Sequence, residues 1–127
     1  MEKTISVGGK EVRMRATALI PRLYRFKFQR DMIRDMNKLR AAFRKATDLP
    51  EDATEEEIQD AQLSALDLTI FENVAWLMIK HAGEDIPDDP DEWLDSLDGI
   101  FPIYEVLPQI LEMWEGNLAT TSVPRKK

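Results

Sequence analysis

The segment Ala61–Ile79 constrains the fold most, because its apolar residues fall on nearly every face of a helix. A surface helix has one apolar stripe, whereas a helix that is apolar all round is normally buried. Upstream, Thr54 and Glu57 have the spacing of a capping box, which starts a helix by satisfying free backbone N–H groups. Downstream, Gly83 suits the position just after a helix end. We therefore predict a helix over about 54–82 at the centre of the domain.

The N-terminal part of the chain offers two elements to cover that helix. Residues 3–16 alternate apolar and polar side chains around Gly8-Gly9, which is typical of a β-hairpin with a tight turn. Residues 17–46 have apolar side chains at helical spacing and basic side chains on the remaining faces. We predict an amphipathic helix with Thr17 as N-cap, and the pattern leaves open an interruption near Gln29.

The C-terminal part contains two further helices. Asp89 and Pro90 suit the cap and first position of a helix over 90–98, and Gly99 suits its end. The last helix is expected over 102–118, with Pro108 kinking or splitting it. Residues 119–127 are expected to form a flexible basic tail. The predicted fold is mostly α, an N-terminal β-hairpin followed by a bundle of about four to five helices in one domain over 1–118.

Charge is distributed unevenly along the chain. Residues 1–47 contain 13 Lys and Arg against four acids, a net charge of +9. Residues 48–124 contain 20 acids and a single base, Lys80, a net charge of −19. Such asymmetry bears on association with other molecules rather than on the fold.

Few residues suggest catalysis, a metal or a cofactor. The chain has no cysteine, which excludes disulfides, thiolate metal sites and cysteine nucleophiles. His81 is the only histidine, and its place at a predicted helix end favours a structural role over that of a general base. The acidic run 84–91 lacks the alternating ligands and central glycine of a calcium loop. We expect no enzyme activity and no cofactor. Because the sequence has no long apolar run, we also expect that it contains no secretory signal and no membrane span.

The basic segment from Arg22 to Lys45 leaves nucleic acid open as a partner. Its arginines alternate with Tyr24, Phe26 and Phe28, which suits contact with a phosphate backbone and stacking on bases. Against this, the aromatic residues have core-like helical spacing and the rest of the chain is strongly acidic. We favour an acidic protein surface as the partner and keep a small nucleic-acid-binding regulator as the alternative.

Three ordered blocks of sequence carry a resemblance to a known family. They are Phe71–Met78 (FENVAWLM), Ile86–Asp95 (IPDDPDEWLD) and Tyr104–Leu111 (YEVLPQIL). Together with the strand-like start and the basic, aromatic segment Arg22–Phe26, they make nearly the whole chain resemble the tail assembly chaperones of long-tailed bacteriophages that infect Gram-positive bacteria.

The resemblance implies a role in assembly. Such chaperones are thought to coat the tape measure protein, a very long helical chain, and to keep it soluble and extended until tail tube subunits polymerise around it. A phage or prophage protein of this kind would act in the host cytoplasm and be absent from the mature virion. Many are also made in a longer form by ribosomal frameshifting. The longer form of the chain and the tail tube protein are therefore further expected partners. The family supplies no catalytic residue to carry over.

Two sets of residues are candidate binding surfaces. If the last helix carries more apolar surface than the core can cover, its surplus would bind a client protein through Leu107, Ile110, Leu111 and Trp114. Head-to-tail self-association would use opposite charges on two copies. The candidate residues are Arg22, Arg25, Arg30 and Arg34 on the basic side and Glu84, Asp85, Asp88 and Asp89 on the acidic side.

Overall fold

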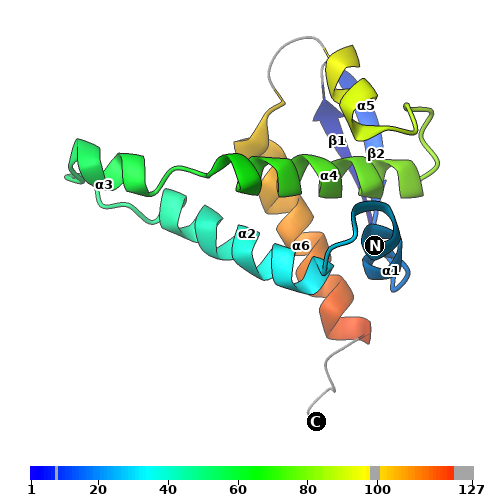
Figure 1. The fold of residues 1–127 in the computed structure, drawn as a ribbon, viewed down its shortest axis with the longest axis horizontal. Helices are drawn as coiled ribbons and strands as arrows, with labels where there is room; N and C mark the ends of the chain where they lie inside the picture. Colours follow the sequence, from blue (N-terminus) through cyan, green and yellow to red (C-terminus); the bar gives the residue numbers. More distant parts are fainter. Residues whose placement is uncertain (8, 98–100, 122–127) are drawn as a thin grey trace.

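The computed structural model describes residues 1–7, 9–97 and 101–121. These residues form an antiparallel hairpin followed by six helices, which confirms the predicted fold class (Figure 1). The strands are β1 (Glu2–Val7) and β2 (Lys10–Arg15). The helices are α1 (Ile20–Phe28), α2 (Met32–Thr47), α3 (Glu55–Asp60), α4 (Ala65–His81), α5 (Pro90–Ser96) and α6 (Ile103–Thr121).

The apolar helix α4 lies at the centre of the fold, as its sequence predicts. Its residues Phe71, Val74 and Met78 are at most 1% exposed. The helix contacts β2, α1, α2, α5 and α6, and Figure 1 shows it crossing the middle of the molecule. Gly83, just after its end, has φ +87°, a left-handed conformation that glycine adopts without steric cost. Most other elements are therefore held together through one helix.

The predicted helix over 54–82 is divided in two, which corrects its expected continuity. The capping box at Thr54 forms and starts α3. A second capping box starts α4, because the Ser64 hydroxyl accepts from the Asp67 N–H while the Asp67 carboxylate accepts from the Ser64 N–H. Ser64 has an extended backbone (φ −73°, ψ 166°). Because this conformation is not helical, α3 cannot continue across Ser64 into α4.

The hairpin forms as predicted and supplies one wall of the core. Ile5 lies opposite Val12 in the antiparallel register. Gly9 has φ +79°, the left-handed conformation that a tight hairpin turn needs, while Gly8 falls outside the described residues. Ile5 and Met14 are 3% and 0% exposed, and the strands contact α4 and α6. Packing on helices therefore stabilises a hairpin that would be marginal alone.

The predicted helix over 17–46 is divided at the residue where an interruption was left open. Gln29 has a left-handed backbone (φ 58°) and ends α1. The Asp31 carboxylate then accepts hydrogen bonds from the N–H groups of Ile33 and Arg34 and caps α2. The chain turns sharply between the two helices, and this α1–α2 corner shapes the candidate site described below.

A buried carboxylate holds the two sides of the α1–α2 corner together. The Tyr24 hydroxyl donates to Asp35 at 2.8 Å, and the Arg30 guanidinium donates to both Asp35 oxygens at 2.7 and 2.9 Å. Burial on its own raises the pKa of Asp35, but the hydrogen bonds from Arg30 and Tyr24 outweigh it and hold that pKa below its usual value. Burial and then Asp35 raise the pKa of Tyr24. The carboxylate is therefore ionised and joins α1 to α2.

Thr17 and His81 link the start of α1 to the end of α4. Thr17 is not the N-cap, a position that Leu19 occupies, so the predicted cap is corrected. Instead the Thr17 Oγ1 lies 2.9 Å from His81 Nε2. Burial lowers the pKa of His81, and Arg15 lowers it further. The imidazole is therefore favoured in its neutral form, in a structural contact.

The two last helices agree with the prediction in part. Pro90 is the first residue of α5, as predicted, but the Asp89 side chain makes no capping hydrogen bond. The helix ends at Ser96, before the predicted boundary at residue 98, and Gly99 lies outside the described residues. Pro108 does not split α6, which continues through it to Thr121. The helix therefore extends beyond the predicted boundary at residue 118, and the rest of the predicted tail, residues 122–127, lies outside the described residues.

Replacing the buried carboxylate should destabilise the protein. We expect Asp35→Asn to lower the free energy of unfolding by about 2 kcal/mol. The substitution removes the negative charge that strengthens the hydrogen bonds from Arg30 and Tyr24, and it places a buried amide N–H₂ among these donors. Urea unfolding followed by circular dichroism measures the change. The control Asp95→Asn alters an exposed aspartate on α5 and should shift the free energy by less than about 0.5 kcal/mol. Equal effects of the two substitutions would contradict the role of Asp35.

Mild acid should destabilise the protein through His81. Its pKa is lower in the folded chain than the ordinary value of 6.5, so the unfolded chain takes up a proton first as the pH falls. Stability should decrease between pH 6.5 and the folded-state pKa and then level off with respect to this group. Melting temperatures measured from pH 7.5 to 5.5 should fall less in His81→Gln, whose amide can still contact Thr17. Parallel curves for both proteins would rule the histidine out as the cause.

Candidate partner-binding surfaces

The apolar residues predicted to bind a client on α6 are buried instead. Leu107 and Ile110 are 0% exposed, Trp114 is 1% exposed and Leu111 is 9% exposed. Helix α6 packs against α4 and β1, so these side chains belong to the protein's own core. The structure therefore corrects the location of the predicted client-binding face. The sequence could not show this because hydrophobic spacing identifies an apolar face without identifying what covers it.

Large apolar side chains are exposed at other places. The two most exposed aromatic residues are Phe26 on α1, at 69%, and Tyr104 on α6, at 58%. Tyr104 lines a hollow of about 160 Å³ together with Ile58, itself 44% exposed. This apolar hollow lies where α2, α3 and α6 meet and is completed by Ala46, Leu49, Ala61 and Gln62. Sequence reasoning missed it because its residues come from three separate elements.

The acidic loop after α4 is largely engaged within the molecule. The Lys80 Nζ lies 2.6 Å from a carboxylate oxygen of Asp88, and hydrogen bonding with Lys80 lowers the pKa of Asp88. Glu84 accepts a hydrogen bond from the Arg13 N–H at 2.8 Å and pairs with its guanidinium at 3.5 Å. Two of the four acids predicted for self-association are therefore neutralised locally. Asp85 and Asp89 stay exposed and make no ion pair among the described residues.

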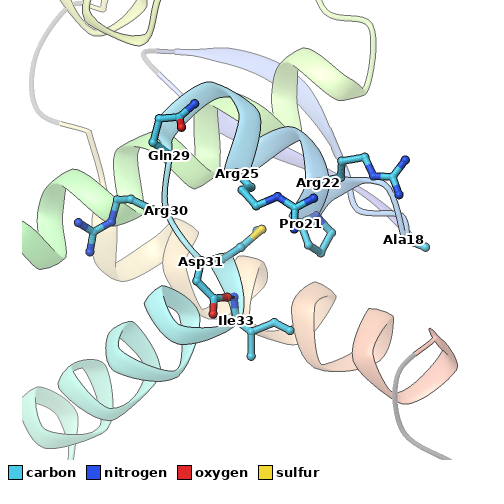
Figure 2. Close-up of a pocket in the computed structure, with 9 residues that line it drawn as sticks. Ala18, Pro21, Arg22, Arg25, Gln29, Arg30, Asp31 and Ile33 are labelled. Atoms are coloured by element: carbon cyan, nitrogen blue, oxygen red, sulfur yellow. The ribbon is translucent and has the colours of Figure 1, made fainter.

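Three of the four predicted arginines line one concavity at the α1–α2 corner. This cavity of about 590 Å³, which we call the arginine pocket, is lined by Ala18, Pro21, Arg22, Arg25, Gln29, Arg30, Asp31, Met32 and Ile33. Figure 2 shows Arg22 and Arg25 projecting from the same side of α1, whereas Arg30 points away from them. Arg34 does not line the pocket but lies nearby in the first turn of α2.

The arginines of the pocket differ in whether their charge is neutralised. Arg30 is held by Asp35, as described above. Arg22 and Arg25 are exposed and make no ion pair among the residues that the structure describes. Ile33, 47% exposed, adds an apolar wall beside them. The Asp31 carboxylate also lines the pocket, where it accepts hydrogen bonds from the N–H groups at the start of α2. The pocket therefore presents two free guanidinium groups beside one capping carboxylate and apolar surface, an arrangement that can bind carboxylates carried by a protein.

Helix α3 is a free acidic surface that sequence reasoning interpreted only as a helix start. Residues 51–60 contain six acids and no base, and no residue of α3 is buried. Glu57 is occupied by the capping box, whereas Glu55, Glu56 and Asp60 make no ion pair among the described residues. Figure 1 shows α3 at one end of the molecule, beyond the end of α2 that lies farthest from α1. The free charges are thus separated in space.

The described residues contain no arrangement that indicates metal binding. No three of their histidine and acidic side chains are placed to hold a metal ion. His81 contacts Thr17, and the positive charge of Arg15 acts on it. No helix within the described part of the chain is long and apolar enough to cross a membrane.

Comparison with known proteins adds no family to these observations. No family model, no curated protein and no solved structure matches this chain. The geometry of the surfaces described above, together with the sequence, is therefore the basis for assigning a function.

Proposed function

We propose that this chain is a tail assembly chaperone that associates with itself and coats a phage tape measure protein until tail tube subunits replace it. The observation that carries the proposal is the separation of free charge, with two unpaired arginines in a concavity at one corner and an exposed acidic helix at the far end. A protein with complementary surfaces at separate places can add copies head to tail, as a coat on a long client requires.

The blocks behind the family resemblance lie in the scaffold rather than on these surfaces. Phe71–Met78 forms the middle of α4, Ile86–Asp95 covers the acidic loop and most of α5, and Tyr104–Leu111 is the first half of α6. Trp76 in the first block donates its indole N–H to the Pro87 carbonyl in the second at 2.9 Å. The first two blocks thus contact each other, and all three belong to the helical framework that positions the surfaces used in the proposal.

The expected strength of self-association suits a coat that must later be removed. An exposed ion pair contributes about 0–1 kcal/mol and is weakened by salt. A contact of two or three such pairs, with some apolar surface, gives weak and reversible assembly. Tail tube subunits that bind the client more tightly would then displace the chaperone.

The apolar hollow is the surface that we assign to the client. Tape measure proteins are long helices, and an amphipathic helix inserts its apolar side chains into grooves on its partner. The hollow offers the side chains of Ile58 and Tyr104 at the meeting point of three helices. It takes the role first predicted for the buried face of α6.

One observation favours the second candidate, a small nucleic-acid-binding regulator. Phe26, directly after the free Arg25 on α1, is 69% exposed and could stack on a base. The candidate is weaker because α3, the acidic loop and the other acids give the chain a net charge of −7, which repels a polyanion.

Purified protein should form oligomers whose size increases with concentration and decreases with salt. The reason is that the proposed contact depends on exposed charge. Light scattering at about 50 mM and about 500 mM salt measures the effect. Between these two conditions the Debye length, the range over which exposed charges interact, falls about threefold. A strictly monomeric protein at low salt would contradict self-association, and a retarded nucleic-acid band in a gel at low salt would favour the second candidate.

Co-expression should convert an insoluble tape measure fragment into a soluble complex. We expect Tyr104→Gln to weaken client binding about tenfold, because it removes apolar surface worth about 1–2 kcal/mol from the hollow. The soluble fraction of the fragment and pull-down titration measure the change. Phe26→Gln, an exposed aromatic residue changed in the same way at a distant place, is the control and should bind as the unchanged protein does. No gain of solubility with the unchanged chaperone would remove the client from the proposal.

A further inference from the structure

We propose that helix α3 of one copy docks into the arginine pocket of the next copy, so that its free carboxylates bind Arg22 and Arg25. This inference rests on the self-association in the proposed function and deepens it by naming both surfaces. The acidic partner is therefore α3 rather than the loop Glu84–Asp89 expected from the sequence.

Helix α3 has the properties of an element that lacks a partner in its own chain. It has six residues and none is buried. Isolated helices of this length are unstable in water, because nucleation is costly and few hydrogen bonds form in return. The capping box at Thr54 offsets part of that cost. A second molecule that packs against α3 would supply the remaining stabilisation.

The face of α3 available for docking is acidic. Ile58 and Ala61 line the apolar hollow and define the side of the helix that faces the protein. With about 3.6 residues per turn, Glu56, Gln59 and Asp60 fall on the opposite side. Glu56 and Asp60 are one turn apart, which places two carboxylates next to each other. Docking through this face leaves the apolar hollow free for a client.

The arginine pocket matches that face in charge and chemistry. Arg22 and Arg25 are three residues apart on α1 and therefore lie on the same side of the helix, as Figure 2 shows. Each guanidinium can donate two parallel hydrogen bonds to a carboxylate. Ile33, which is half exposed, provides apolar surface for the stem of a glutamate or glutamine side chain. The pocket is thus suited to the side chains of an acidic helix.

The two surfaces belong to different copies because the fold keeps them apart within one copy. Helix α2, with 16 residues, separates them by about 24 Å at about 1.5 Å per residue. Each copy then offers one pocket and one helix at separate ends. The contact is heterologous, and repeated use of it builds an open chain rather than a closed dimer. Such a chain has the form of a coat along an extended client.

The acidic loop is the main competitor for the pocket, and its internal contacts argue against it. Glu84 is engaged by Arg13 and Asp88 by Lys80, so docking through either of these acids would first break an ion pair, and Asp85 and Asp89 are the two loop acids that stay free. Lys27 on α1 also donates to the Asp88 carbonyl at 3.4 Å, which places a cation beside the loop already. The free carboxylates of α3 need no such exchange.

Two charge-neutralising variants test the docking. The pocket variant is Arg22→Gln with Arg25→Gln, and the helix variant is Glu56→Gln with Asp60→Asn. All four residues are exposed, so both variants should fold as the unchanged protein does, which circular dichroism checks. We expect each variant alone to need at least tenfold higher concentration for half-maximal assembly at low salt, measured by sedimentation velocity.

An equimolar mixture of the variants gives the decisive result. The pocket variant keeps a native α3, and the helix variant keeps a native pocket, so one native contact can form between them. We expect a one-to-one heterodimer that does not grow further. A mixture that stays monomeric, or variants that assemble separately like the unchanged protein, would overturn the docking. So would assembly that disappears when bound nucleic acid is digested.

A matched control separates α3 from the acidic loop. Asp85→Asn with Asp89→Asn removes two exposed acids, the same change in net charge as in the helix variant. It should assemble as the unchanged protein does, and a monomeric control beside an assembling helix variant would overturn the assignment to α3.

Normal solubilisation of the client by variants that still oligomerise would reject the docking and keep the proposed function. The expected heterodimer without any effect on the client would reject the function and keep the docking.

Discussion

The burial of α4 is the constraint on which the rest of the structure depends. A helix that is apolar on nearly every face must be covered on all sides, and in this chain the hairpin, α1, α2, α5 and α6 provide the cover. Leu107 and Trp114 on α6 are needed for that purpose, which is why they are unavailable to a partner. Association must therefore use what the core leaves at the surface, namely charge and exposed apolar side chains such as those of the apolar hollow.

The charges of the two halves cancel in part when the chain folds. Within the described residues, three ion pairs join them, Lys3 to Glu112, Arg13 to Glu84 and Arg40 to Glu115. The charge separation seen along the sequence is therefore smaller in the folded molecule. Free charges remain on several elements, including Asp91 and Glu92 on α5. Arg22 and Arg25 share one concavity, and the free carboxylates of α3 lie together at the far end of the molecule. This grouping is what gives the proposed contact an orientation.

Local signals in the sequence were sufficient to predict most helices and strands. They did not predict where a helix is interrupted or which elements pack on which. The hairpin, the buried helix and the Thr54 capping box follow from alternation, apolar periodicity and cap chemistry within short windows. The break before α4 was missed because the box at Ser64 lies within ten residues of an equally good box, and either could have started one long helix. Pairings such as Arg13 with Glu84, 71 residues apart, depend on tertiary structure and leave no trace in composition.

A distance measurement between copies tests the central claim most directly. The chain has no cysteine, so a nitroxide attached to Gln62→Cys, an exposed position just after α3, would label one site only. Mixed with isotopically labelled but otherwise unchanged protein, it reports by nuclear magnetic resonance which residues of the other copy approach α3. The account predicts selective broadening of signals from Arg22, Arg25 and Ile33. Broadening centred on another surface, or none at concentrations where oligomers form, would contradict it.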